Sequence, residues 1–381
     1  MKVGEPAAPR SFFPPSSFIL HPSYLMKLGL VRRGYSHSGG AERYLLRFAD
    51  ALKEAGHEAV LFGSREWPAG AWSREFVRVE GDGPRQFADG LRRAKPREHC
   101  DLVFSLERVW ECDAYRAGDG VHRAWLERRR AFEPAWKGWF RATQGKHREI
   151  LELENAVFAP DTDRVIIANS RMVAGEIARY FQVPGKRVRV IYNGLPAAKP
   201  APEGRRAETR ARLGLAEGEC AVLFVGSGWE RKGLRFAIEA VNRTKDATLL
   251  VAGTGKRRGL PPSGRTRFME TVGQIGDLME AADIFLLPTI YDPFSNASLE
   301  AMAAGLPVIT TDANGFAEIM RPGKDGEVLA SPADVEAIAA GIRKWAADPP
   351  ESRRRRRTEA QRYTMEANVR ATLSALSPRS V

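Results

Sequence analysis

A basic pair lies in a loop that leaves an apolar strand pattern and enters a helix pattern. The loop Val225–Leu234, with sequence VGSGWERKGL, carries Arg231 and Lys232 beside the start of that helix. A helix N-terminus favours anions, and an Arg–Lys pair there can neutralise the charge that develops on a leaving diphosphate without a metal. A plainer alternative stays open, because two exposed cations before a helix are common.

Two carboxylates lie in a second loop-to-helix segment, Tyr291–Asp312, with sequence YDPFSNASLEAMAAGLPVITTD. A helix predicted to begin near Asn296 places Asp292 in the loop before it and Glu300 one turn inside it. One carboxylate can accept hydrogen bonds from sugar hydroxyls, while the other reaches a ribose diol. Helix-start amides suit phosphate oxygens, and here they belong to Ser295, Asn296 and Ala297. The alternative is a capped helix with incidental acids.

The loop Tyr35–Gly40, with sequence YSHSGG, places Gly39 and Gly40 at a predicted helix N-terminus. Because glycine has no side chain, a phosphate or a sugar can approach the backbone amides of this loop closely. A tight turn would need the same residues. The loop lacks the GxGxxG pattern, which disfavours a dinucleotide as its ligand.

Short apolar strand patterns alternate with longer helix patterns along the chain, which is typical of parallel α/β units. In the first half the predicted strands are Leu28–Arg33, Glu58–Gly63, Asp101–Leu106, Arg164–Asn169 and Arg187–Tyr192. In the second half they are Cys220–Val225, Ala247–Ala252, Arg267–Val272, Asp283–Pro288 and Leu306–Thr311. Ligands of open α/β sheets bind beyond the carboxyl ends of the strands, so the loops above are predicted to face a common cleft.

The length of 381 residues is too great for one ordinary core and predicts two domains. The first 25 residues are rich in Pro and Ser and hold no apolar stretch long enough for a secretory signal. The predicted division is a disordered leader at 1–25, a Rossmann-like domain at 26–195, a linker at 196–205, a second Rossmann-like domain at 206–365, and a C-terminal helix and tail at 366–381.

The net charge of +12 indicates an anionic partner, which could be nucleic acid, an anionic membrane or a phosphorylated substrate. The five arginines at Arg353–Arg357 are predicted to lie on a solvated helix face. No nucleic-acid-binding module accompanies them, so nucleic acid is not the expected partner. Cys100, Cys112 and Cys220 are odd in number and widely spaced, which disfavours a disulfide framework and a zinc site and favours a cytoplasmic protein.

The segment 122–150, HRAWLERRRAFEPAWKGWFRATQGKHREI, combines cations with large aromatic residues. It holds eight Arg or Lys against three Glu, and its aromatic residues are Trp125, Phe132, Trp136, Trp139 and Phe140. Basic residues pair with anionic headgroups and aromatic rings favour the membrane interface, so peripheral attachment to an anionic membrane is one prediction. The alternative is that the aromatic rings pack into the N-terminal core while the arginines face water.

Taken together, the motifs resemble glycosyltransferase family 4. The resemblance rests on the order and spacing of VGSGWERKGL, the GTG at Gly253–Gly255 and DLMEAADIFLLPTIYDPFSNASLEAMAAGLPVITTDANGFAEI. The first half is most similar to the lipopolysaccharide core glucosyltransferase I branch, through CDAYRAGDGVHRAWLERRR and a following ELEN stretch. The resemblance implies a GT-B fold, an α/β architecture of two facing Rossmann-like domains with a cleft between them. It also implies retaining transfer of a hexose from a nucleotide diphosphate-sugar, with no metal or cofactor.

The resemblance assigns roles to the residues singled out above. Arg231 and Lys232 would hold the diphosphate, and Glu300 would hold the ribose. Asp292 would meet the transferred hexose at its 3- and 4-hydroxyls, although the family more often has Glu there, which leaves the preferred sugar open. The remaining substrate-binding residues would be Gly39, Gly40, Phe294, Ser295, Asn296 and Ala297.

Two further residues, Asp119 and His122, follow the Tyr115–Gly118 stretch. By the resemblance they would join Asp292 near the reacting carbon of the sugar, as catalytic residues, and a structural role for either is the alternative. A D-x-D motif at Asp161–Asp163 precedes a predicted strand instead of following one, so a metal is not expected there.

The expected reaction moves a hexose, by the resemblance glucose from a UDP-sugar, to a lipid-linked oligosaccharide such as the lipopolysaccharide core. The enzyme would work at the inner face of the cytoplasmic membrane. Two other classes stay open: a nucleotide-sugar epimerase of the same architecture, and a basic membrane- or nucleic-acid-binding protein without catalysis.

Overall fold

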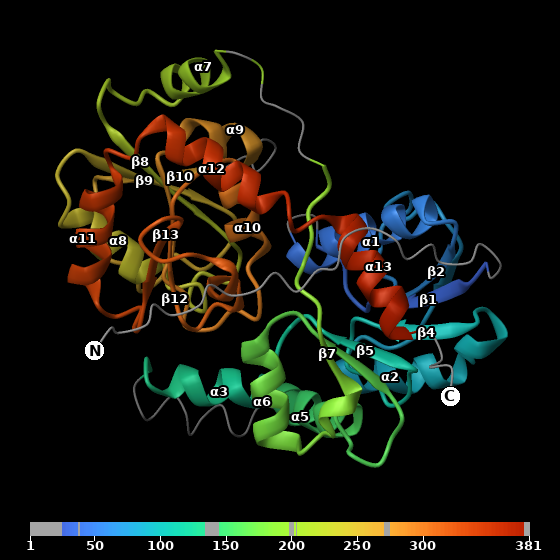
Figure 1. Cartoon of the computed structure of the whole chain (residues 1–381). Coiled ribbons are helices and arrows are strands. Elements are labelled where there is room, and N and C mark those ends of the chain that lie inside the picture. The colour runs from blue at the N-terminus through green and yellow to red at the C-terminus, as the bar shows by residue number, and fades with distance from the viewer. Residues whose placement is uncertain are drawn as a thin grey trace, which may run out of the picture.

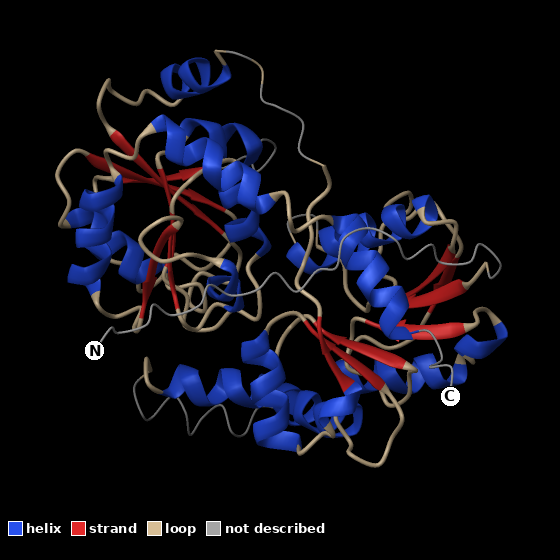
Figure 2. Ribbon diagram, viewed as in Figure 1, coloured by secondary structure: helices blue, strands red, loops and turns tan. Residues whose placement is uncertain are grey.

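The computed structural model describes residues 25–36, 39–133, 145–197, 202, 204–269 and 275–376. Its described part contains two parallel β-sheets with helices packed on them (Figures 1 and 2). The first sheet is built from the N-terminal half of the chain and the second from the C-terminal half. The predicted pair of α/β domains is therefore present.

The first sheet has the strand order β3-β2-β1-β4-β5-β6-β7, and all of its pairings are parallel. Its strands are β1 (Lys27–Val31), β2 (Glu58–Gly63), β3 (Phe76–Arg78), β4 (Leu102–Ser105), β5 (Ala114–Ala117), β6 (Val165–Ala168) and β7 (Val188–Val190). The chain reverses its direction of travel across the sheet between β1 and β4. A crevice at such a switch point is where open α/β sheets bind ligands.

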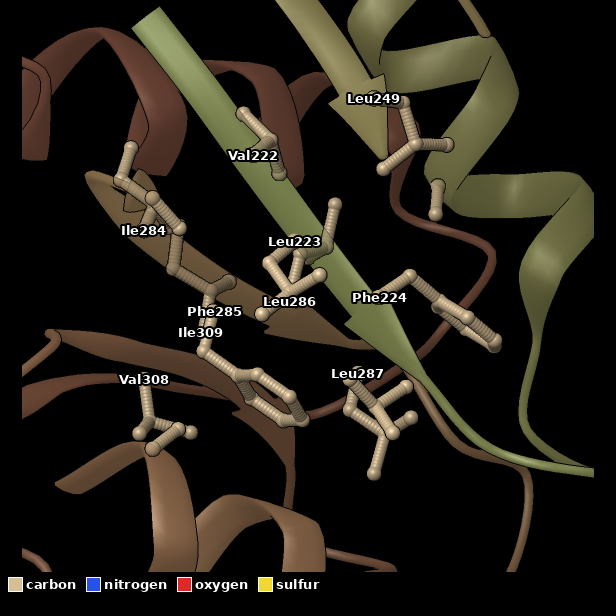
Figure 3. Close-up of a cluster of buried hydrophobic side chains, with 14 of the residues drawn as sticks. Val222, Leu223, Phe224, Leu249, Ile284, Phe285, Leu286, Leu287, Val308 and Ile309 are labelled. Carbon is tan, nitrogen blue, oxygen red and sulfur yellow. The ribbon is translucent and has the colours of Figure 1, made fainter. Parts of the chain in front are cut away.

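The second sheet repeats this arrangement with the order β10-β9-β8-β11-β12-β13. Its strands are β8 (Cys220–Val225), β9 (Ala247–Ala252), β10 (Thr266–Met269), β11 (Ile284–Leu287), β12 (Val308–Thr311) and β13 (Gly326–Leu329). Strands β8, β9, β11 and β12 are buried along their whole length, as parallel strands covered on both faces must be. Figure 3 shows the aliphatic and phenyl side chains of these strands packed together.

Helices connect the strands. The N-terminal half contains α1 (Gly40–Glu54), α2 (Pro84–Arg93), α3 (His122–Arg130), α5 (Gly145–Val157) and α6 (Arg171–Phe181). The C-terminal half contains α7 (Arg205–Arg212), α8 (Leu234–Asn242), α9 (Ile275–Ala281), α10 (Asn296–Ala303), α11 (Val335–Trp345), α12 (Pro350–Ala360) and α13 (Met365–Leu376). No helix in the described ranges is long and apolar enough to cross a bilayer.

The last helix, α13, returns to the first half of the molecule and lies along α1 (Figure 1). Its apolar residues Val369 and Leu373 join a core cluster with Phe48 of α1. The hydroxyl of Tyr44 also donates to the side-chain oxygen of Asn368 at 2.8 Å. The C-terminal helix therefore completes the N-terminal core.

All the strands predicted from the sequence are present, with ends that differ by up to two residues, and three strands were not predicted. The predicted end of the strand at 267–272 lies outside the described residues. Strand β3 has three residues, two of them only half-buried, so it carries little apolar signal. Strand β5 is short and contains a charged residue, Arg116. Strand β13 begins with Gly326 and Glu327, so only its last two residues are apolar and the strand carries little apolar signal.

The prediction of a solvated arginine run at Arg353–Arg357 is wrong for one member. These residues lie in α12, where Arg354 and Arg355 are exposed but Arg356 is completely buried. The Arg356 guanidinium pairs with Asp348 and donates to the backbone oxygen of Gly305 at 2.8 Å. This arginine therefore holds α12 against the preceding loops.

Candidate active site

A cavity of about 350 Å³ lies where the two halves meet. Its walls are the loops that follow β1, β5, β8 and β11, together with the N-termini of α1 and α10. The loops after β1 and β8 lie at the two switch points, so the topology of both sheets brings them to one place. The cavity thus occupies the position at which a ligand would contact both domains.

Most of the predicted site residues line this cavity. The structure brings together Gly39, Gly40, Asp119, Arg231, Lys232, Asp292, Phe294, Ser295, Asn296 and Ala297. They come from four segments of the chain, so their proximity depends on the folded arrangement of both sheets. Two predicted residues, His122 and Glu300, are not part of the lining.

Lys232 and Asp292 form a buried ion pair in the cavity wall, with side chains only 12% and 6% exposed. Burial lowers the pKa of Lys232, and the charge of Asp292 opposes that shift. The basic loop is fixed to the acidic one by the backbone oxygen of Arg231, which accepts from the amide of Ile290 at 2.9 Å. Gly233 allows this approach, because its φ is +75° and a Cβ there would collide with a backbone oxygen.

Helix α10 starts with a rigid cap that points into the cavity. The Ser295 hydroxyl accepts from the amide of Ser298 at 3.1 Å, and the Asn314 side chain accepts from the amide of Ser295 at 3.2 Å. The helix begins at Asn296, as the sequence predicts. Capping by Ser or Asn is the usual way to satisfy a helix start, and it keeps the remaining amides in place.

The N-terminus of α1 faces that of α10 across the cavity. Gly39 precedes α1, and a Cβ on it would lie only 1.7 Å from a carboxylate oxygen of Glu42. The backbone oxygen of Gly40 accepts from the Asn296 side-chain amide at 3.4 Å. Two helix N-termini therefore contribute positive potential to the same space.

Asp119 lies in the cavity wall beside Arg32, which approaches it at 3.3 Å. Arg32 also pairs with Glu42 at 2.9 Å. Burial alone would raise the pKa of Asp119, but the charges of Arg32, Arg108 and Arg231 outweigh it and hold the pKa below its usual value. Asp119 is therefore a carboxylate at neutral pH.

His122 is the first residue of α3, and its ring contacts the ring of another histidine, His147. Its Nε2 lies 3.0 Å from Nδ1 of His147, with the two rings stacked. Burial, together with the charge of Arg108 and the proximity of His147, lowers the pKa of His122 to about 3. The ring is therefore neutral at physiological pH, and it is held outside the cavity.

Glu300 lies one turn inside α10 but contacts the opposite half of the molecule. Its carboxylate accepts from Arg47 at 2.8 Å and lies 3.9 Å from Arg43, and both arginines belong to α1. Its side chain is 14% exposed. The role predicted for Glu300 at a ribose stays a prediction.

Several lining residues were missed by sequence reasoning. Arg116 lies one residue before the end of the unrecognised strand β5, and Asn193 follows β7, so the rule that ligands bind at the carboxyl ends of strands would have pointed to both. Gly253, which was used only as part of the GTG motif and assigned no role, also lines the cavity. A Cβ on Gly253 would lie 2.3 Å from the backbone oxygen of Gly226, so this position requires glycine.

The cavity lining carries an excess of two positive charges. Its ionised side chains are the cations Arg32, Arg43, Arg116, Arg231 and Lys232 and the carboxylates Glu42, Asp119 and Asp292. Asp161 and Asp163 of the D-x-D motif lie at the opposite, amino-terminal end of β6. The site therefore suits an anion of charge near −2, such as a diphosphate, that also carries hydroxyl groups.

Two family models match this chain in sequence order. The model for "Glycosyltransferase Family 4" matches residues 38–199, and the model for "Glycosyl transferases group 1" matches residues 219–348. The chain belongs to the family 4 glycosyltransferases. Each match falls on one of the two sheets of this glycosyltransferase, which favours the transferase over the epimerase and non-enzymatic alternatives.

Curated relatives extend the comparison over most of this glycosyltransferase. The lipopolysaccharide core biosynthesis glycosyltransferase LpsE of Rhizobium meliloti (strain 1021) is 28% identical, covering 82% of this chain and 87% of the relative. The lipopolysaccharide glucosyltransferase WaaG of Escherichia coli (strain K12) is 24% identical, covering 83% and 88%. The predicted similarity to lipopolysaccharide core transferases is confirmed.

Solved structures confirm the GT-B fold of this glycosyltransferase. The crystal structure of WaaG superposes with a TM-score of 0.73 at 22% identity, covering 88% of this chain and 94% of that one. The structure of HepE from Anabaena in complex with UDP-glucose has a TM-score of 0.68 at 19% identity, covering 92% and 99%.

The aromatic and basic segment 122–150 is described except for residues 134–144, which include Trp136, Trp139 and Phe140. Trp125 packs beside Tyr291, with ring centroids 6.4 Å apart, and Phe132 packs edge-on against Phe236 at 6.0 Å. Tyr291 and Phe236 both belong to the C-terminal half. These two aromatic residues therefore pack against the C-terminal half, whereas the alternative interpretation expects them in the N-terminal core.

Proposed function

We propose that this glycosyltransferase moves a hexose, glucose in the first instance, from a UDP-sugar to a lipid-linked glycan such as the lipopolysaccharide core. Transfer retains the anomeric configuration and needs no metal ion. The observation that carries the proposal is the cavity between the halves, with its excess of two positive charges and two inward-facing helix N-termini. The names of LpsE and WaaG support the acceptor, and the UDP-glucose complex of HepE supports the donor.

In this scheme the cations of the β8–α8 loop act on the leaving group. Arg231 and Lys232 neutralise charge as it develops on the diphosphate, and the α10 amides donate to the phosphate oxygens. Asp292 accepts from hexose hydroxyls, and its pairing with Lys232 fixes its position. Glu300 accepts from the ribose, for which it must exchange its contact with Arg47.

Asp119 is a lining carboxylate on the N-terminal side, and the charges of Arg32, Arg108 and Arg231 keep it ionised. We place it near the anomeric carbon, where an anion stabilises the positive charge that builds up as the glycosidic bond to phosphate breaks. His122 has no place in this scheme, because it does not line the cavity.

The proposal is tested with a panel of nucleotide sugars and extracted lipopolysaccharide core as acceptor. We expect release of nucleoside diphosphate from UDP-glucose only when the acceptor is present, and undiminished turnover after exhaustive chelation. Release without acceptor, or interconversion of the donor sugar, would favour hydrolysis or epimerisation. A requirement for added magnesium or manganese would contradict the metal-independent mechanism.

We further propose that the enzyme attaches peripherally to the inner face of the cytoplasmic membrane through the segment 122–150. Arg130, Lys146 and Arg148 of this segment are exposed, and none of them pairs with a carboxylate of the described residues. Each such cation contributes ~1 kcal/mol at an anionic bilayer surface. Since Trp125 is engaged by the protein, Trp136 and Trp139 are the aromatic residues to test.

Sedimentation with vesicles checks this attachment. Replacing the three exposed cations by glutamine should weaken binding to anionic vesicles about a hundredfold, at ~1 kcal/mol each. Trp136→Ser with Trp139→Ser should weaken it further, and neutral vesicles should bind poorly throughout. The matched control removes the exposed cations Arg243, Lys245 and Arg258 of the C-terminal half. Equal losses in both sets would mean that only the total charge matters.

A further inference from the structure

Arg116 differs from every other buried arginine of the described residues. The five are Arg108, Arg116, Arg164, Arg187 and Arg356. Arg108 pairs with Glu154 at 3.0 Å, and Arg356 pairs with Asp348. Arg164 and Arg187 instead donate to clusters of backbone oxygens. Arg116, only 5% exposed, has neither kind of support.

The surroundings of Arg116 are polar or aromatic but not anionic. Its guanidinium lies over the Tyr44 ring, 3.7 Å from the centroid, and donates to the side-chain oxygen of Asn193. Its Nε is buried without an acceptor. No described carboxylate lies within ion-pair distance. Because burying an uncompensated charge is costly, this arrangement is expected only where an anion binds.

A series of side-chain contacts that starts at Arg116 indicates where an anion would bind. Arg116 lines the cavity, and Asn193, which accepts from it, donates in turn to the Asn296 side-chain oxygen at 2.6 Å. Asn296 is the first residue of α10, and its amide end reaches the backbone oxygen of Gly40 at 3.4 Å. Arg116 therefore lies beside the two facing helix N-termini, where positive potential is greatest.

We propose that Arg116 is a diphosphate-binding residue supplied by the N-terminal domain, an inference that rests on the proposed donor class. Arg231 and Lys232 approach the diphosphate from the C-terminal sheet, and Lys232 is already paired with Asp292. Arg116 and Arg231 are then the two lining arginines with no described carboxylate within ion-pair distance, matching a diphosphate of charge near −2. Donor binding thus draws on both domains.

Titration calorimetry with UDP, UMP and uridine tests this inference. Arg116→Met should weaken UDP binding at least thirtyfold, the usual consequence of removing one partner of a buried charge pair. It should weaken UMP binding less and leave uridine binding unchanged. The matched control is Arg258→Met, which removes an exposed arginine outside the cavity and should change none of the three affinities.

Folding of each variant is checked by thermal unfolding, because Arg116 also packs on Tyr44. If the methionine variant does not fold, Arg116→Gln, whose amide can still donate to Asn193, takes its place with the same expectation. Unchanged UDP affinity in a folded variant, or equal losses for UDP and uridine, would overturn the role of Arg116. A wild-type protein that binds no nucleoside diphosphate would overturn the proposed function as well, so the two failures are distinguishable.

Discussion

Lys232→Ala should lower the rate of sugar transfer roughly a hundredfold, since removing one transition-state charge contact costs ~3 kcal/mol. The lysine is buried in the cavity wall and is held by Asp292, so its ammonium has a fixed position from which to meet a leaving diphosphate. Arg231→Ala should give a loss of similar size. Steady-state kcat/KM with saturating acceptor is the measurement.

The control is Lys245→Ala, which removes an exposed lysine of the same domain that does not line the cavity. It should transfer at the wild-type rate. Circular dichroism and thermal unfolding verify that the site variants remain folded. Near wild-type turnover in both Lys232→Ala and Arg231→Ala would contradict the placement of the diphosphate on this side of the cavity.

Asp348→Ala should lower the free energy of unfolding by about 3–5 kcal/mol, because it leaves the fully buried guanidinium of Arg356 without its counter-ion. The loss should appear as a lower midpoint in urea at unchanged slope. The double variant Asp348→Ala with Arg356→Met should be less destabilised than the single one, because no unpaired charge then remains.

Arg354→Ala provides the matched control for the arginine run. This residue is exposed on the same helix, α12, and its removal should change the free energy of unfolding by less than about 0.5 kcal/mol. If Asp348→Ala were as mild as Arg354→Ala, the buried pair would contribute nothing to holding α12.

The arginine run shows where pattern reasoning fails. Successive helix residues are turned by about 100°, so five consecutive arginines cover the whole circumference and one of them must face inward. Composition alone therefore predicts a solvated face for Arg353–Arg357, whereas geometry requires a buried member, which is Arg356. Its partner Asp348 precedes the helix and carries no signal of its own.

The site was predictable to the extent that its motifs follow recognisable strands. The loops after β8 and β11 follow fully buried apolar strands, and their residues reach the cavity as expected. The direct pairing of Lys232 with Asp292 was not predictable, because 60 residues separate them and only the neighbouring strands bring them together. Arg116 was missed because its charge interrupts the apolar pattern by which the short strand β5 could have been recognised.

The chain crosses between the two halves twice, near residue 195 and again near residue 364, and these two crossings are hydrogen-bonded to each other. The backbone amide of Leu195, on the outward passage, donates to Tyr363 on the return passage at 2.9 Å, and Leu195 accepts from Met365 at 2.8 Å. Gly194 makes room, as a Cβ there would lie 2.1 Å from the Thr364 oxygen. The two crossings are therefore joined at one point, formed by residues 194–195 and 363–365. A rotation of the halves about this point would keep both hydrogen bonds, whereas sliding one half past the other would break them.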